Sequence, residues 1–522
     1  MKTRTRSMII FLCLTVLLVL SPYHSAQAAS CTWDGSNGNW DDDERWSCPS
    51  GPGMNDDAII NGGQVTLSTN TSVLSLTFSG GLLKGTGNLT ADTINWSGGM
   101  MEGPGSATAS SEANFTGSDL IQLIDGYTFN NAGAATWNRT GELYINPLTA
   151  NFNNQLGASF TVQTAGGTMV SGGGMFTNDG TISYASPGGS TIGLGFVNSS
   201  TGTVSVESGL FEISNMIASV SPSSGAYNVL SGATLRLRGA TAPYNLSGNI
   251  TGTGTGTIEI AGVVNITGTF TFPGTISITG INYGRLNLST NSTTANIGIL
   301  NMSDTNGTLM GPGHLTAGTI NWSRGTMSGT GSTTASSALN FTGSDLIQLI
   351  DGRTFNNAGA ATWNRTGELY INPLTTNFNN QLGATFTVQS SGSYIVSGGG
   401  TFRNAGTLNL TTGTINTNTF TQEAGGITNL AMRGTTPVTD YSQLIVSNLI
   451  LTGPLNISFS GGYTPNVGDH FILQQYSSTR TGNFSPVNIN PIPGIIWVLY
   501  YKDGSLHLWA MKCQIFIPLL IK

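Results

Sequence analysis

A long internal duplication constrains the fold of this chain more than any other feature. The residues FTGSDLIQLIDG occupy 115–126 and recur at 341–352, 226 positions later. Over the 48 positions that begin at these two phenylalanines, the copies differ at Tyr127/Arg353, Ala150/Thr376 and Ser159/Thr385. A block that is copied in tandem suits an architecture in which each unit contacts only its neighbours.

A shorter repeat lies within each copy. Segments that start with Phe and carry Asn two positions later begin at Phe129, Phe152, Phe176 and Phe196, with spacings of 23, 24 and 20 residues. The second copy has them at Phe355, Phe378 and Phe402. Alternating apolar residues follow, as in a strand with one buried face, and Gly and Asn supply the turns. We expect the aromatic rings and the Asn side chains of successive coils to stack.

Short strands at a period of about 20–24 residues predict a solenoid, because one coil cannot bury its own inner face. The predicted fold class is all-β, a right-handed parallel β-helix over residues 58–430. It contains the tandem duplication, at about 65–285 and 286–430, with the second copy partial. About 16 to 18 coils at ~4.8 Å give a rod of roughly 80 Å. Turn density and period-2 alternation exclude helical solenoids, and two separate β-sandwiches remain as the alternative.

The first 28 residues predict a Sec-type signal peptide. A basic start precedes an apolar stretch at 8–20 and the small-residue pattern that ends at Ala28. The apolar stretch is short for a transmembrane anchor. In the other alternative, a lipoprotein modified at Cys31, Ala28 stands where a lipobox normally has Leu. We therefore expect a secreted or cell-surface bacterial protein without a transmembrane span in the mature chain.

Composition limits the partners of the chain. Removal of the three cations in the signal peptide takes the net charge from −7 to −10, so no nucleic-acid partner is expected. Charged residues make up 8% of the chain and hydrophobic residues 38%, which does not match the high charge and low hydrophobicity of disordered chains. The composition is typical of β-rich extracellular proteins.

Residues 29–57 are predicted to form a disulfide-bonded N-terminal cap. Cys31 and Cys48 lie 17 positions apart and are expected to pair in an oxidising compartment. The segment also contains Trp33, Trp40 and Trp46. It resembles the W-x-G…G-x-W…W…P…D-x-A-x-I entry module that precedes β-helical regions in bacterial secreted proteins. We expect the Trp rings to cover the first coil, with a sugar-stacking or calcium site as the alternative.

Residues 431–511 are predicted to form a C-terminal β cap. They are similar to the terminal β module of bacterial autotransporter-passenger-like surface proteins at 461–465, 468–471, 482–484 and 497–500. This resemblance implies a secreted or cell-surface β-helix, often adhesin-like, without shared catalytic residues. A membrane β-barrel and an LPxTG-type signal are missing from the pattern. The apolar tail at 512–522 is interpreted as a sorting tag or a last edge strand, and Cys513 as a free or modified thiol.

An enzyme is the alternative function, since parallel β-helices also include polysaccharide lyases and hydrolases. Such enzymes need clustered carboxylates, with Ca²⁺ or a basic residue in lyases. The candidates are Asp119, Asp125, Arg139 and Glu142, and their copies Asp345, Asp351, Arg365 and Glu368. Because Arg139 and Glu142 flank a turn, a surface salt bridge is the simpler interpretation. No zinc cluster, calcium repeat or phosphate loop is present in the sequence pattern, so no metal or cofactor is expected.

Binding is the favoured function. Trp96, Trp137, Trp322 and Trp363 are candidates for stacking on glycans if their rings face solvent; inward packing is the other possibility. The change from Tyr127 to Arg353 suggests that this position points to solvent. The sequence thus predicts a structural or adhesin-like surface protein without catalysis, which contacts extracellular glycans or cell-envelope components.

Overall fold

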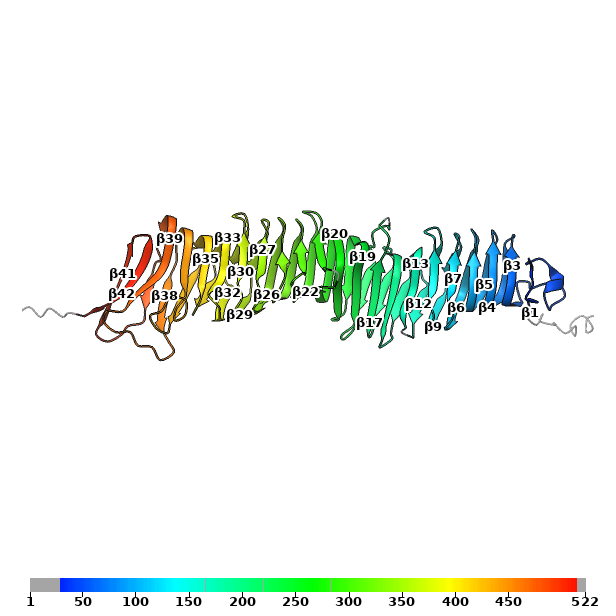
Figure 1. The fold of residues 1–522 in the computed structure, drawn as a ribbon, viewed down its shortest axis with the longest axis horizontal. Coiled ribbons are helices and arrows are strands. Elements are labelled where there is room, and N and C mark those ends of the chain that lie inside the picture. Colours follow the sequence, from blue (N-terminus) through cyan, green and yellow to red (C-terminus); the bar gives the residue numbers. More distant parts are fainter. Residues whose placement is uncertain (1–28, 165, 219, 282, 514–522) are drawn as a thin grey trace, which may run out of the picture.

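The computed structural model describes residues 29–513 except 165, 219 and 282. These residues form one parallel β-solenoid of about 17 turns, drawn out as a single rod in Figure 1. At ~4.8 Å per turn the rod is about 80 Å long. The predicted parallel β-helix is confirmed. The predicted signal peptide and residues 514–522 of the tail lie outside the described residues.

The first copy of the duplication shows how a coil is built. Strand β8 (Thr128–Asn131) pairs in parallel with β11 (Asn151–Asn154), and β11 pairs with β13 (Gly167–Asn178). A second row runs through β7 (Ile121–Ile124), β10 (Leu143–Asn146) and β13, and a third through β9 (Ala134–Arg139) and β12 (Ser159–Val162). Each strand therefore forms its backbone hydrogen bonds with the equivalent strands of the coils before and after it.

The phenylalanines of the short repeat stack inside the rod. Phe129 and Phe152 have ring centroids 5.2 Å apart, and Phe152 and Phe176 have centroids 4.6 Å apart. All three are fully buried. The predicted piling of these rings is confirmed, because a period of one coil places each ring over its equivalent.

A buried ladder of Asn side chains runs beside the rings. The amide nitrogen of Asn131 donates to Asn154 Oδ1 (2.7 Å), Asn154 donates to Asn178 (2.7 Å), and Asn178 donates to Asn198 (2.8 Å). The second amide hydrogen of Asn131 donates to the carbonyl of Ser159, which lies on the next coil (2.8 Å). These buried amides are tolerated because the repeat supplies each with the same partners.

The second copy repeats this arrangement. Its strands are β27 (Ile347–Ile350), β28 (Thr354–Asn357), β29 (Ala360–Arg365), β30 (Leu369–Asn372), β31 (Asn377–Asn380), β32 (Thr385–Ser390) and β33 (Tyr394–Asn404). Phe355 and Phe378 stack at 5.3 Å, and Phe378 and Phe402 at 5.1 Å. The duplication therefore adds whole coils and preserves the register of the sheet.

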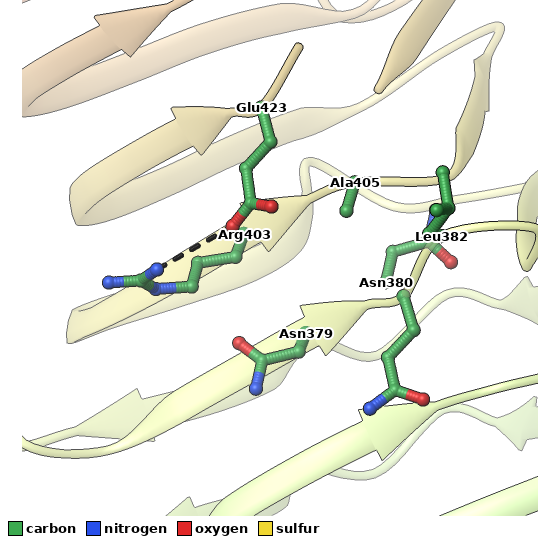
Figure 2. Close-up of a pocket in the computed structure, with 7 residues that line it drawn as sticks. Asn379, Asn380, Leu382, Arg403, Ala405 and Glu423 are labelled. Atoms are coloured by element: carbon green, nitrogen blue, oxygen red, sulfur yellow. Dashed lines mark ion pairs between the residues drawn. The ribbon is translucent and has the colours of Figure 1, made fainter. Parts of the chain in front are cut away.

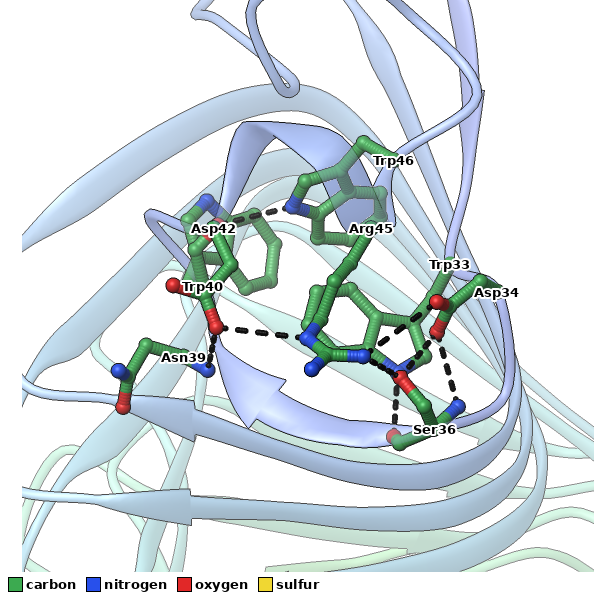
Figure 3. A network of polar contacts seen from close by, with 8 residues as sticks. All are labelled: Trp33, Asp34, Ser36, Asn39, Trp40, Asp42, Arg45 and Trp46. Carbon is green, nitrogen blue, oxygen red and sulfur yellow. Dashed lines mark hydrogen bonds and ion pairs between the residues drawn. The ribbon is translucent and has the colours of Figure 1, made fainter.

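The N-terminal end is covered by the Trp-rich segment. Strands β1 (Ser30–Thr32) and β2 (Asn37–Asn39) pair with β3 (Asp57–Leu67), and a short 3-10 helix η1 spans Asp43–Arg45. Trp46 contacts Trp33 and Trp40 with centroid distances of 5.1 and 5.0 Å, and its indole donates to the carbonyl of Trp40 (Figure 3). The predicted Cys31–Cys48 disulfide is present.

Parallel stacking continues past residue 430 at the C-terminal end. Strands β37 (Gln443–Leu451), β38 (Leu455–Phe459), β39 (His470–Gly482) and β40 (Val487–Ile489) still pair in parallel with neighbouring coils. The direction changes where β39 pairs antiparallel with β42 (Ser505–Lys512), which pairs antiparallel with β41 (Ile495–Lys502). This antiparallel hairpin terminates the ladder.

Candidate functional site

Three of the four candidate residues of the first copy, Asp119, Arg139 and Glu142, lie at one corner, and Asp125 lies apart from them. Asp119 and Glu142 lie at the corner that precedes β7 and β10, where the amide of Ile121 donates to the carbonyl of Glu142 (3.0 Å). Asp125 lies at the other end of β7, in a left-handed turn with φ 54°. A four-residue strand separates the corners by about 13 Å, so the carboxylates of Asp119 and Asp125 are not presented together.

Arg139 points into the rod, and the predicted surface salt bridge with Glu142 is wrong. The side chain of Arg139 is 2% exposed. Its Nε donates to the carbonyl of Gly141 (3.2 Å), its Nη2 to the carbonyl of Asp119, and its guanidinium lies 5.6 Å from the Trp137 ring. Burial lowers the pKa of Arg139 to about 10. The carboxylate of Glu142 accepts instead from the hydroxyl of Ser171.

The corresponding corner of the second copy carries an additional ion pair. Arg365 donates to the carbonyls of Asp345 and Gly367, as Arg139 does in the first copy. The carboxylate of Asp345 also binds the guanidinium of Arg324 (2.5 Å), where the first copy has Gly98. Asp351 again lies across the strand in a left-handed turn, with φ 61°. The two copies thus separate the same carboxylates in the same way.

The Trp residues proposed for glycan stacking are all inside the rod. Trp96, Trp137, Trp322 and Trp363 are at most 1% exposed. They contact Phe rings of adjacent coils, for example Trp96 and Phe115 at 6.0 Å. Their exposure as a glycan surface is therefore excluded, and the inward packing that the sequence left open is found.

The prediction that Tyr127 and Arg353 face solvent is also wrong, since both are at most 1% exposed. Arg353 donates from Nε to Thr333 Oγ1 (2.8 Å). Its other nitrogens donate to the carbonyls of Gly311, Ser328 and Ser332 at 3.0–3.1 Å. Burial lowers the pKa of Arg353 to about 10. Tyr127 and Arg353 lie two positions before the buried Phe129 and Phe355. Strand alternation therefore already indicated that their side chains point into the rod.

No metal centre is found in the part of the chain that the structure describes. There, no three His, Cys, Asp or Glu side chains gather to hold an ion. His470 and His507 on β39 and β42 form a pair without a third such neighbour, and their ring nitrogens Nε2 and Nδ1 are 3.0 Å apart. Among residues 29–513, apart from the three gaps, no helix has the length and apolar character needed to cross a bilayer.

Two hollows lie on the outer surface of the second copy. Figure 2 shows the first, in which the Arg403–Glu423 ion pair (3.6 Å) stands near Asn379, and Leu382 lies at the rim. In the register of the coils, Arg403 and Glu423 stand where the first copy has Thr177 and Ser199, so this charge pair belongs to the second copy alone.

The second hollow contains a residue that was predicted from the sequence, Glu368. It lies with Tyr394 and Leu346, which come from the coils on either side. Tyr394 was missed by the sequence analysis. An alignment of the two copies would have pointed to Tyr394, because the first copy has Thr168 at the same position.

Comparison with known proteins found no family whose pattern matches the chain and no curated protein similar to it.

Proposed function

We propose that the chain is a secreted or cell-surface bacterial rod with a structural or adhesive role, which presents an extended surface to glycans or other cells. The observation that carries this proposal is the parallel register that continues through both copies of the duplication. A duplicated block of about ten coils adds ~48 Å of length. Length and repeated surface are what a spacer or a multivalent binder gains from such an addition.

The outer surface supports the same proposal. Ladders of Asn side chains link successive coils on the outside, as in Asn409, Asn429, Asn456 and Asn488, whose amides are joined at 2.7–2.8 Å. Such ladders satisfy polar groups between coils and need no charge. The resulting surface is rich in amides and hydroxyls, groups that also form hydrogen bonds with sugars.

Export is supported by the predicted signal peptide and by the Cys31–Cys48 disulfide, since disulfides persist in oxidising compartments. For the polysaccharide-degrading alternative, Asp119 and Glu142 share a corner, but β7 and its copy β27 hold Asp125 and Asp351 at the opposite corner, so the four predicted residues do not form one groove. The similarity of the C-terminal region to autotransporter-passenger-like proteins adds to the case for a surface protein.

Deletion of one repeat length tests the modular rod. Removal of residues 97–322 joins Trp96 to Ser323 and restores the sequence context of Trp322. We expect a folded rod whose longest dimension, measured by small-angle scattering, is shorter by ~48 Å. Deletion of 97–311 is the matched control, because it shifts the register by about half a coil and should misfold. Equal misfolding of both deletions would reject the modular rod.

Location is a separate test. Antibodies against the rod should label intact cells that produce the protein, and the mature chain should begin at Ala29. Recovery of the uncleaved chain in the cytosol would reject a surface role.

A further inference from the structure

The hollow around Glu368 is built by three consecutive coils of the second copy. Ser344 and Leu346 lie between β26 (Ser332–Gly343) and β27. Thr366 and Glu368 occupy the turn between β29 and β30 on the next coil. Tyr394 begins β33 on the third coil. Because β27, β30 and β33 pair in parallel, these corners lie above one another and span about 10 Å.

The groups in this hollow combine an apolar face with hydrogen-bonding groups. The side chains of Tyr394 and Leu346 are 42% and 45% exposed. Ser344, Thr366 and Ser393 contribute hydroxyls. Within the described residues the carboxylate of Glu368 makes no hydrogen bond or ion pair, so both of its oxygens are available to a ligand. An aromatic ring beside a carboxylate and hydroxyls matches the apolar face and the hydroxyl edge of a pyranose.

The first copy lacks two of these properties. Thr168 stands at the position of Tyr394, so no aromatic ring lines the corner. Glu142, the equivalent of Glu368, already accepts a hydrogen bond from Ser171. The duplication therefore provides a matched pair of corners in one chain. The second has an exposed ring and an unpaired carboxylate, and the first has neither.

We propose that the Glu368–Tyr394 hollow binds a neutral oligosaccharide, with one or two sugar rings between Tyr394 and Glu368. The inference rests on the proposed surface role for its biological use, and its chemistry is tested independently of that role. The carboxylate of Glu368 accepts hydrogen bonds from sugar hydroxyls, and such charge-assisted bonds are stronger than neutral ones. The same carboxylate disfavours uronic acids and sialylated chains, and the net negative charge of the protein adds to this discrimination.

Binding of defined sugars to the full exported chain tests the proposal. The probes are cello-, chito- and manno-oligosaccharides of four rings, with oligogalacturonate as the acidic comparator, each titrated by calorimetry. We expect at least one neutral probe to bind at one site per chain. Tyr394→Ala should weaken that binding about tenfold, which corresponds to ~1.4 kcal/mol, and Glu368→Gln should weaken it by roughly three- to tenfold.

The controls use the first copy and the chemistry of the ring. Thr168→Ala and Glu142→Gln should leave the affinity unchanged, and Tyr394→Phe should preserve most of it because the ring remains. Far-UV circular dichroism checks that each variant is folded. The proposal is overturned if no neutral probe binds, if the acidic probe is preferred, or if Tyr394→Ala and Glu142→Gln have equal effects. These outcomes leave the antibody labelling and the repeat deletion unaffected, so failure here is distinct from failure of the surface role.

Discussion

The buried contact between Arg353 and Thr333 should give a measurable coupling energy. In the first copy the equivalent residues are Tyr127 and Ala107, so the second copy differs at both members of the pair. Arg353 Nε donates to Thr333 Oγ1 at 2.8 Å, and both side chains are 0% exposed. The perturbation is a double-mutant cycle with Arg353→Tyr, Thr333→Ala and the combined variant, which recreates the pair found in the first copy.

The structure sets the expected size of the coupling. A hydrogen bond from a charged donor contributes about 1.5–3 kcal/mol net. Thr333→Ala leaves Nε without that acceptor, and Arg353→Tyr leaves the Thr333 hydroxyl without its donor. The double variant suffers neither loss. We therefore expect its cost to be smaller than the sum of the single costs by about 2 kcal/mol.

Urea denaturation followed by far-UV circular dichroism measures the four free energies of unfolding. Hydrogen–deuterium exchange then shows whether the change is confined to the coils around β27 and β28. The control cycle pairs Arg353→Tyr with Thr385→Ser. Thr385 lies on β32, which pairs with β29 and β34 (Thr407–Leu410), and it is not one of the hydrogen-bond partners of Arg353. The control should be additive within about 0.5 kcal/mol. A coupling as small as the control's would refute the reasoning.

Three further predictions concern the cap, the buried ladder and the C-terminal hairpin. Replacement of both Cys31 and Cys48 by Ala should destabilise the cap by ~3 kcal/mol and speed hydrogen exchange in residues 29–67; unchanged exchange would contradict this. Asn154→Ala removes ladder bonds on both sides and should cost about 2–3 kcal/mol in urea denaturation, against less than ~1 for the outer Asn153→Ala; equal costs would argue against the buried ladder. Burial, and then the neighbouring His507, lower the pKa of His470 below its unfolded value of ~6.5. The stabilisation from neutral His470 is therefore present above about pH 6.5 and is lost as the pH falls through the folded pKa. The thermal midpoint of the wild type should drop more between pH 7 and 5 than that of His470→Gln, and parallel curves would exclude this residue as the cause.

Much of the fold was predictable because its main interactions repeat at the period of the coil. Phe129 and Phe152 lie one coil apart in sequence, so their stacking follows once the period is recognised. The buried Asn ladder follows from the same spacing. The Trp-rich cap was also predictable, because the open end of a solenoid needs an apolar cover.

The side chains of the candidate site were harder to place. The sequence favours a surface position for Arg139, because it flanks a turn with Glu142, and for Arg353, because the two copies differ there. The alternation with Trp137 and Phe355 pointed inward in both cases. A buried Arg is tolerated here because carbonyl groups from other coils accept its hydrogen bonds, and the nearest sequence neighbours do not reveal those carbonyls.

The sequence by itself determined the parallel solenoid, its duplicated coils and the alternation of inward and outward positions, because these depend on a period within the chain. The tertiary structure decided which polar groups find partners. It brought the carbonyl of Gly311 to Arg353, across 42 residues of sequence, and placed Tyr394 in the hollow of Glu368. Such contacts between coils depend on how turns of unequal length align when the coils stack. That alignment is a property of the assembled rod.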